Sequence, residues 1–141
     1  LEVGNGRMNF SFPVAEQALR QGLYPDIISS DATARTFAGV PDMKDLAFVM
    51  SKFWNMGMEL SQILYSVTSA PARCLGLKNR EDGRIKIGDE ADLTALRAVK
   101  QETVFKDSEG NRRSGDRLLV PEMTILDGKI VYFQGWPEFL A

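Results

Sequence analysis

Two strand-like segments flank a helical one within residues 1–31, and no other pattern in the sequence limits the possible folds as strongly. Leu1–Val3 and Ile27–Ser30 are short apolar or β-branched segments, as expected of buried strands. Between them, Phe12–Arg20 has apolar residues on one helical face and Pro13 in its first turn. Parallel strands need a long crossover of this kind, whereas tight turns join antiparallel strands. The pattern therefore predicts a βαβ unit in a parallel sheet and an α/β fold.

The pattern is helical after residue 41 and changes to strands and turns near residue 80. The expected helices run from Met43 to Gly57 with Asp42 as N-cap, from Leu60 to Val67, and from Pro71 to Leu75. The expected strands are 91–96, 102–105, 118–126 and 129–133, with Asp127-Gly128 as a hairpin turn and Pro121 marking an edge or a bulge. We therefore expect two parts, residues 1–80 and residues 81–141, the second being a small antiparallel β unit.

Composition limits the chemistry that the chain can perform alone. Its 141 residues include no histidine, although a zinc hydrolase site usually needs two or three imidazoles. A net charge of −2 argues against a nucleic-acid partner, and no apolar run reaches the roughly 20 residues of a membrane span. One cysteine, Cys74, excludes an internal disulfide and is expected to be a buried thiol. Leu1–Gly4 lacks a signal-peptide pattern, so we expect a cytoplasmic location.

A carboxylate, Asp31, directly follows the second predicted strand. The C-terminal edge of a parallel sheet is where such folds carry their functional side chains. In a metal hydrolase, an aspartate at this place can bind a divalent ion, take a proton from the hydrolytic water and pass it to the leaving group. The alternative is a helix or loop cap, because aspartate is common in that role. The residue pattern leaves both interpretations open.

The loop after the first predicted strand, Gly4-Asn5-Gly6-Arg7, would lie beside Asp31 on the same edge of the sheet. Its glycines would let the backbone approach a ligand, and an arginine can bind a substrate carboxylate as a fork. The candidate substrate-binding residues are Asn5, Arg7, Arg35 and Gly39, the last two lying in the loop beyond Asp31. A plain βα turn and a solvated loop arginine are the alternatives.

Four motifs occur along the chain in a characteristic order. They are Ile28–Asp31, Met50–Phe53 with Gly57-Met58, Val67–Leu77, and Gly83–Leu93. The last two contain the specific patterns T-x-x-P-A-x-x-L-G-L and G-x-I-x-x-G-x-x-A-D-L. Together they resemble the C-terminal third of the amidohydrolase superfamily, over nearly the whole chain. The branch they resemble most is that of the dihydroorotase-like deacetylases, which act on N-acyl amino acids and related esters.

This resemblance implies part of a (β/α)8 TIM barrel that holds one or two divalent metals, usually zinc, with a small β-sandwich built from both chain ends. Residues 1–80 would be the last barrel units with the C-terminal helices, and residues 81–141 would be the C-terminal segment of the sandwich. Asp31 would match the family's aspartate after the eighth strand, which is a metal ligand and the proton shuttle. The implied function is metal-dependent hydrolysis of an amide or ester bond in a small acylated substrate.

The resemblance also identifies what this chain does not contain. Family members supply a His-x-His pair, a bridging lysine or carboxylate, and two further histidines from earlier strands. The related branch often has Gly-His-Gly where this chain has Gly4-Asn5-Gly6, and Asn where it has Ala70. A whole barrel needs about 250 residues, so we expect the isolated chain to be inactive and to need a missing N-terminal barrel portion or a homo-oligomer. The alternative is a non-catalytic α+β module that binds a partner or a small ligand.

Overall fold

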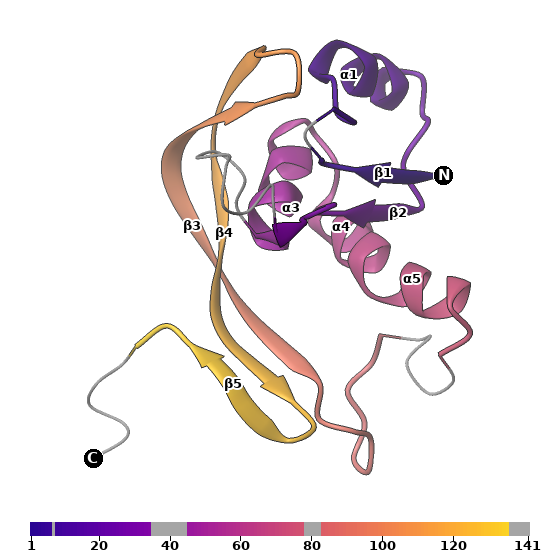
Figure 1. Cartoon of the computed structure of the whole chain (residues 1–141), viewed down its shortest axis with the longest axis vertical. Coiled ribbons are helices and arrows are strands. Elements are labelled where there is room, and N and C mark those ends of the chain that lie inside the picture. The colour runs from indigo at the N-terminus through magenta and orange to yellow at the C-terminus, as the bar shows by residue number, and fades with distance from the viewer. Residues whose placement is uncertain (7, 35–44, 78–82, 136–141) are drawn as a thin grey trace.

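The computed structural model describes residues 1–6, 8–34, 45–77 and 83–135. In chain order the elements are β1 (Glu2–Gly4), α1 (Phe12–Arg20), β2 (Ile27–Ser29), α3 (Leu46–Asn55), α4 (Leu60–Val67), α5 (Ser69–Cys74), β3 (Leu93–Lys106), β4 (Arg112–Leu126) and β5 (Lys129–Phe133). Figure 1 shows the helices and the β1–β2 pair on one side, with the long β3–β4 ribbon curving around them.

The predicted βαβ unit is confirmed. Strands β1 and β2 pair in parallel, with Val3 opposite Ile28, and α1 forms the crossover between them. Helix α1 begins after the extended residue Ser11, and a proline in the first turn costs no hydrogen bond because the N–H groups there have no partner within the helix. Because parallel strands point the same way, the carboxyl ends of β1 and β2 lie at one edge of the sheet.

Helix α4 begins and ends as predicted, at Leu60 and Val67, whereas α3 and α5 begin at other residues than predicted. Helix α3 begins after Asp45, whose side chain accepts a hydrogen bond of 2.9 Å from the Phe48 amide, so Asp45 is the N-cap and the prediction of Asp42 was wrong. Helix α5 begins at Ser69, two residues before Pro71, because proline is tolerated throughout a first turn. No helix in the described part of the chain has the length and apolar composition of a membrane span.

The β3–β4 ribbon is longer than the sequence indicated. Strands β3 and β4 are continuous over 14 and 15 residues where shorter separate strands were expected. Pro121 lies in the central strand of the β3-β4-β5 sheet, next to a bulge, so of the two predicted alternatives the bulge is correct. The Asp127-Gly128 turn is confirmed, and both residues have positive φ, as a two-residue hairpin of type I′ requires.

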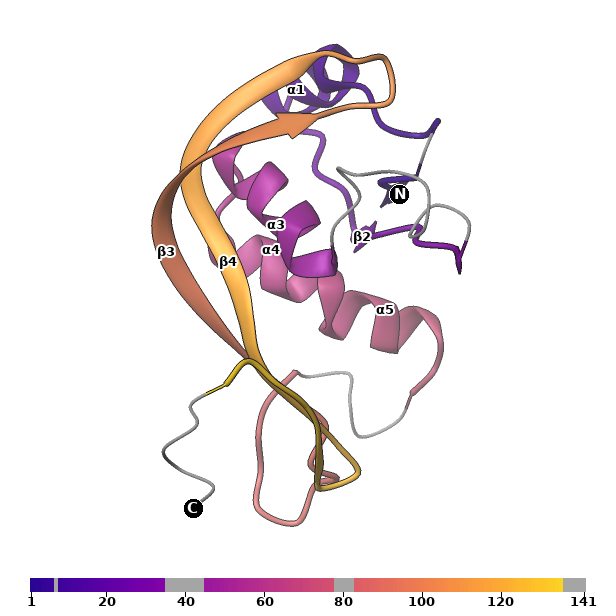
Figure 2. The same ribbon diagram turned by 60° about the vertical axis from the view of Figure 1, so that its left-hand side comes forward.

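Aromatic side chains from both parts of the chain share one core. The Phe10 ring lies 5.3 Å from that of Phe12 and 5.6 Å from that of Phe53, and the Phe48 ring lies 4.9 Å from that of Phe105 on β3. Figure 2 shows the upper part of the ribbon lying against α1 and α3, while its lower part extends beyond them with β5. The division at residues 80 and 81 stays a prediction.

Candidate active-site edge of the sheet

Asp31 lies just beyond the carboxyl end of β2, where the sequence placed it. Its backbone is in the left-handed region with φ of 51°, a conformation that aspartate tolerates better than most residues. The residue is exposed. The backbone thus turns directly after the strand and presents the carboxylate at the edge of the sheet.

Two glycines, one at the end of β1 and one in the loop after it, pack closely against this carboxylate. A Cβ atom added at Gly6 would lie 2.1 Å from Asp31 Oδ2, and one at Gly4 would lie 3.3 Å from Asp31 Cβ. Asn9 Nδ2 donates a hydrogen bond of 2.6 Å to the same Oδ2 atom. The predicted closeness of the two loops is therefore confirmed, and the glycines make room for the Asp31 side chain. Asn9 was not predicted, because nothing in a spacing of 22 residues links the two positions.

Asn5 turns its side-chain oxygen toward the core. Its Oδ1 accepts a hydrogen bond of 2.6 Å from Lys52 Nζ, and its backbone N–H donates to the Ser29 carbonyl at 3.2 Å. The role of Asn5 in substrate binding stays a prediction. The other three predicted substrate contacts, Arg7, Arg35 and Gly39, lie outside the described residues.

Lys52 is a buried cation that the sequence analysis did not single out. Its residue is 3% exposed, and besides Asn5 its ammonium donates to the Lys106 carbonyl at 2.9 Å. Burial lowers the pKa of Lys52 to about 8, although the negative charge of Asp107 opposes this shift. A signal was present in the sequence: Lys52 is the one charged residue in the largely apolar α3 and precedes the buried Phe53.

The prediction that Cys74 is a buried thiol was wrong. Cys74 lies at the last position of α5 and is exposed, since the short helix turns this residue away from the core.

The Asp31 carboxylate could serve as one ligand of a divalent metal ion. The carboxylate is a hard oxygen donor of the kind that zinc and other divalent ions accept. The described residues contain no group of three or more His, Cys, Asp or Glu side chains that could hold a metal ion. A site with three or more such ligands would therefore need at least one of them from outside the described part of this chain.

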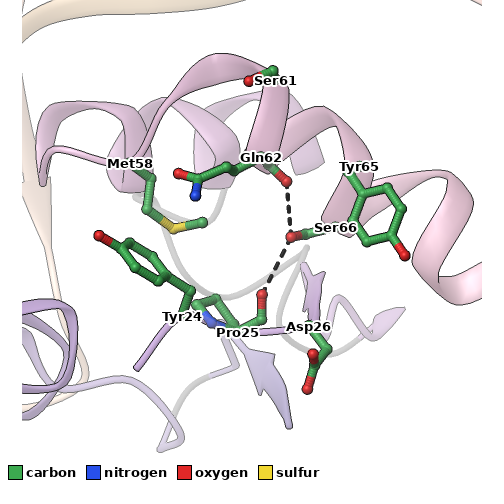
Figure 3. Close-up of a pocket in the computed structure, with 8 residues that line it drawn as sticks. All are labelled: Tyr24, Pro25, Asp26, Met58, Ser61, Gln62, Tyr65 and Ser66. Atoms are coloured by element: carbon green, nitrogen blue, oxygen red, sulfur yellow. Dashed lines mark hydrogen bonds between the residues drawn. The ribbon is translucent and has the colours of Figure 1, made fainter. Parts of the chain in front are cut away.

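A cavity of about 340 Å³ lies at the opposite end of β2. Figure 3 shows it between the segment Tyr24–Asp26, which precedes the strand, and α4. The single proton of the Ser66 hydroxyl is shared between the Pro25 carbonyl at 3.3 Å and the Gln62 carbonyl at 2.9 Å, which ties the two walls together. The amino end of the strand thus has its own polar contacts, separate from those of Asp31.

Comparison with known proteins gives the family. The Amidohydrolase family matches residues 2–132. A deacetylase of Enterococcus faecalis is 36% identical over 129 residues, which are 92% of this chain and 34% of that protein. A deacetylase of Agrobacterium fabrum is 31% identical over 131 residues, covering 93% of this chain and 31% of its own length.

Solved structures agree with this result. The crystal structure of an adenine deaminase superposes with a TM-score of 0.84 at 34% identity, covering 94% of this chain and 35% of that one. A dihydroorotase superposes with a TM-score of 0.85 at 31% identity and with the same coverage. The chain spans about a third of the length of these proteins, and the predicted fold class, the C-terminal part of an α/β amidohydrolase barrel, is confirmed. This chain belongs to the amidohydrolase family.

Proposed function

We propose that the natural protein containing this chain is a metal-dependent amidohydrolase that cleaves an amide or ester bond in a small acylated molecule. The family match and the similarity to two deacetylases support hydrolysis of an acyl group. An adenine deaminase and a dihydroorotase resemble the chain equally well in structure, so the fold alone does not select the leaving group. We propose an N-acyl amino acid or a related ester as the substrate, because both named relatives are deacetylases.

The observation that carries this proposal is the setting of Asp31. The residue follows a parallel strand, adopts the left-handed conformation, and packs its carboxylate against Gly4 and Gly6. The Asn9 amide holds one carboxylate oxygen and so limits the rotation of the group. An oriented carboxylate at this edge is suited to take a proton from water and pass it to a leaving group.

Asp31 is also the proposed metal ligand from this chain. A divalent ion, for which we propose zinc, would supply the Lewis acidity that activates the hydrolytic water. The remaining ligands would come from the rest of the natural protein, in one or two metal sites. We therefore propose that the isolated chain does not hydrolyse substrate, that Asn5, Arg7, Arg35 and Gly39 line the substrate side of the site, and that the protein is cytoplasmic.

The test is a substitution at each end of β2 in the natural protein. Asp31→Asn keeps the shape of the side chain but removes the proton acceptor, so acetate release from N-acetyl amino acids should fall at least about 100-fold. Asp26→Asn changes an exposed aspartate before the same strand and should leave the rate unchanged. Activity retained in Asp31→Asn, or equal losses in the two variants, would contradict the proposed role.

A further inference from the structure

We propose that Lys52 is a positioning residue that holds the β1–α1 loop in place against Asp31 from the core side. We use the name β1–α1 loop for the described residues between Gly4 and Phe12, which are 5, 6 and 8–11. This inference rests on the proposed function, because it concerns how the carboxylate of Asp31 is kept in its working place. It assigns a role to a buried lysine 47 residues away in the sequence from its partner Asn5.

The first step is the set of contacts that the Lys52 ammonium makes. It donates to Asn5 Oδ1 at 2.6 Å and to the Lys106 carbonyl at 2.9 Å, while the centre of the Phe10 ring lies 4.5 Å away. An ammonium group has three donors and an aromatic face attracts a cation, so each of these contacts is favourable. The single charge therefore joins the β1–α1 loop, the aromatic core and the end of β3.

The second step is the path from Asn5 to the carboxylate. Asn5 stands between Gly4 and Gly6, and these are the two residues that pack against Asp31. The contact at Gly6 has no spare room, since even a Cβ atom there would lie 2.1 Å from Asp31 Oδ2. A displacement of Asn5 therefore moves the backbone that limits where the carboxylate can lie.

The third step is the far side of the same loop, which the β3–β4 turn holds. Asp107 Oδ2 accepts a hydrogen bond of 2.9 Å from the Phe12 amide at the start of α1, and the Ser108 amide donates to the Phe10 carbonyl at 3.0 Å. Lys52 is bonded to the carbonyl of Lys106, next to Asp107, and the Asp107 carboxylate also attracts it. The β1–α1 loop is thus held between Asp31 and the turn of the ribbon, with Lys52 beneath it.

A buried cation at this place needs a reason, because burying an ammonium opposes folding even when the charge is hydrogen-bonded. An apolar side chain of similar length would fill the same space among the phenylalanine rings. It would leave Asn5 without its partner. The gain from lysine is therefore specific placement of the loop, and this is what the experiment measures.

The experiment compares variants of the intact natural protein by hydrogen exchange and by kinetics. Lys52→Met removes both hydrogen bonds, and Asn5→Leu removes one of them while leaving the lysine in place. Asn55→Ala is the matched control: it removes the side-chain hydrogen bonds from the same helix to Asp116 and Arg117 of β4, away from the loop. We expect backbone exchange in residues 4–9 to rise about tenfold or more in the first two variants and to stay unchanged in the control.

Kinetics with N-acetyl amino acids as probes then separates positioning from general stability. We expect Lys52→Met to lower kcat about tenfold or more with little change in KM, since misplacing a reacting group by a fraction of an ångström acts mainly on the chemical step. In the Asn5→Leu background, Lys52→Met should lower kcat less than it does in the unmodified protein, because the Lys52–Asn5 contact is already absent and only the bond to the Lys106 carbonyl is left to lose.

Each outcome decides the matter. Unchanged exchange in Lys52→Met, independent effects of Lys52→Met and Asn5→Leu, or an equal loss of kcat in Asn55→Ala would overturn the inference. If Lys52→Met does not fold, Asn5→Leu alone decides through loop exchange. If the unmodified protein hydrolyses none of the probes, the proposed function fails, and the exchange comparison still tests the placement of the loop.

Discussion

Strand β2 has an aspartate beyond each end, and the surroundings of the two differ. Asp26, before the strand, has a largely exposed side chain and borders the cavity of Figure 3. Asp31, after the strand, packs against two glycines of another loop and accepts a hydrogen bond from Asn9. A similar contrast exists in the core, where Lys52 lies under the carboxyl end and Ser66 under the amino end. The comparison indicates that one end of the sheet is built to orient a carboxylate.

The largest effect that sharpens this contrast is expected at Gly6. A Cβ atom in Gly6→Ala would overlap Asp31 Oδ2, and the carboxylate is the group that can move. We expect the fold to survive and the rate of acetate release from N-acetyl amino acids to fall about 100-fold, because Asp31 loses its place. Gly4→Ala, whose Cβ would be 3.3 Å from Asp31, should cost less than a tenfold loss. Equal rates for the two variants would contradict the close fit.

A smaller loss is expected when the hydrogen bond to Asp31 is removed. Asn9→Ala leaves the carboxylate in place but free to rotate, and the bond lies at an exposed position. A loss of about tenfold in kcat corresponds to about 1.4 kcal/mol, the size of one such bond. Kinetics of the natural protein at saturating substrate measures it. A rate unchanged by Asn9→Ala would mean that the glycine contacts alone orient Asp31.

The buried charge under the carboxyl end predicts a dependence of stability on pH. Below pH 8, Lys52 is charged both in the fold and in the unfolded chain. Between about pH 8 and its ordinary value of 10.5 it is neutral in the fold and charged in the unfolded chain, because burial lowers its pKa to about 8. The unfolded chain then binds more protons, so this group makes stability rise with pH, by up to about 1 kcal/mol per pH unit.

Lys52→Met isolates this contribution, because all other titrating groups are common to both proteins. The melting temperature of the unmodified protein should rise relative to that of the variant as the pH increases from 8 to 10. A difference that does not depend on pH would show that Lys52 keeps its ordinary pKa in the fold.

Sequence patterns located the parallel strand pair and the glycine loop beside Asp31, because both depend on local spacing. The spacing of apolar residues predicts the two strands and the crossover helix. Parallel pairing of β1 with β2 then places the loops that follow them at one edge of the sheet. The same reasoning divided β3 into strands at 91–96 and 102–105, because the residues between them include the polar Lys100 and Gln101. Pairing with β4 decides that strand, and pairing across the chain is not visible in local composition.

Asn9 and Lys52 were missed for a related reason. Their contacts join residues 22 and 47 positions apart, so only the folded chain brings the partners together. Asp42 was chosen as N-cap because a suitable residue type stood before an apolar run, but Asp45, three residues later, has the same chemistry and directly precedes the helix. Local sequence preferences therefore predict which residue types can cap a helix, whereas the position of the cap depends on how the helix packs.

The smallest expected effect is at the amino end of β2, beneath Asp26. Ser66→Ala removes the hydroxyl that donates to the Pro25 and Gln62 carbonyls, at the cavity in Figure 3. We expect a loss of stability of about 1 kcal/mol, because the hydroxyl proton shared by these carbonyls is lost, and no change in kcat. Thermal unfolding and kinetics of the natural protein measure the two effects separately. A fall in kcat comparable to that of Asn9→Ala would mean that both ends of the strand serve the site, and the contrast between them would then lie in packing alone.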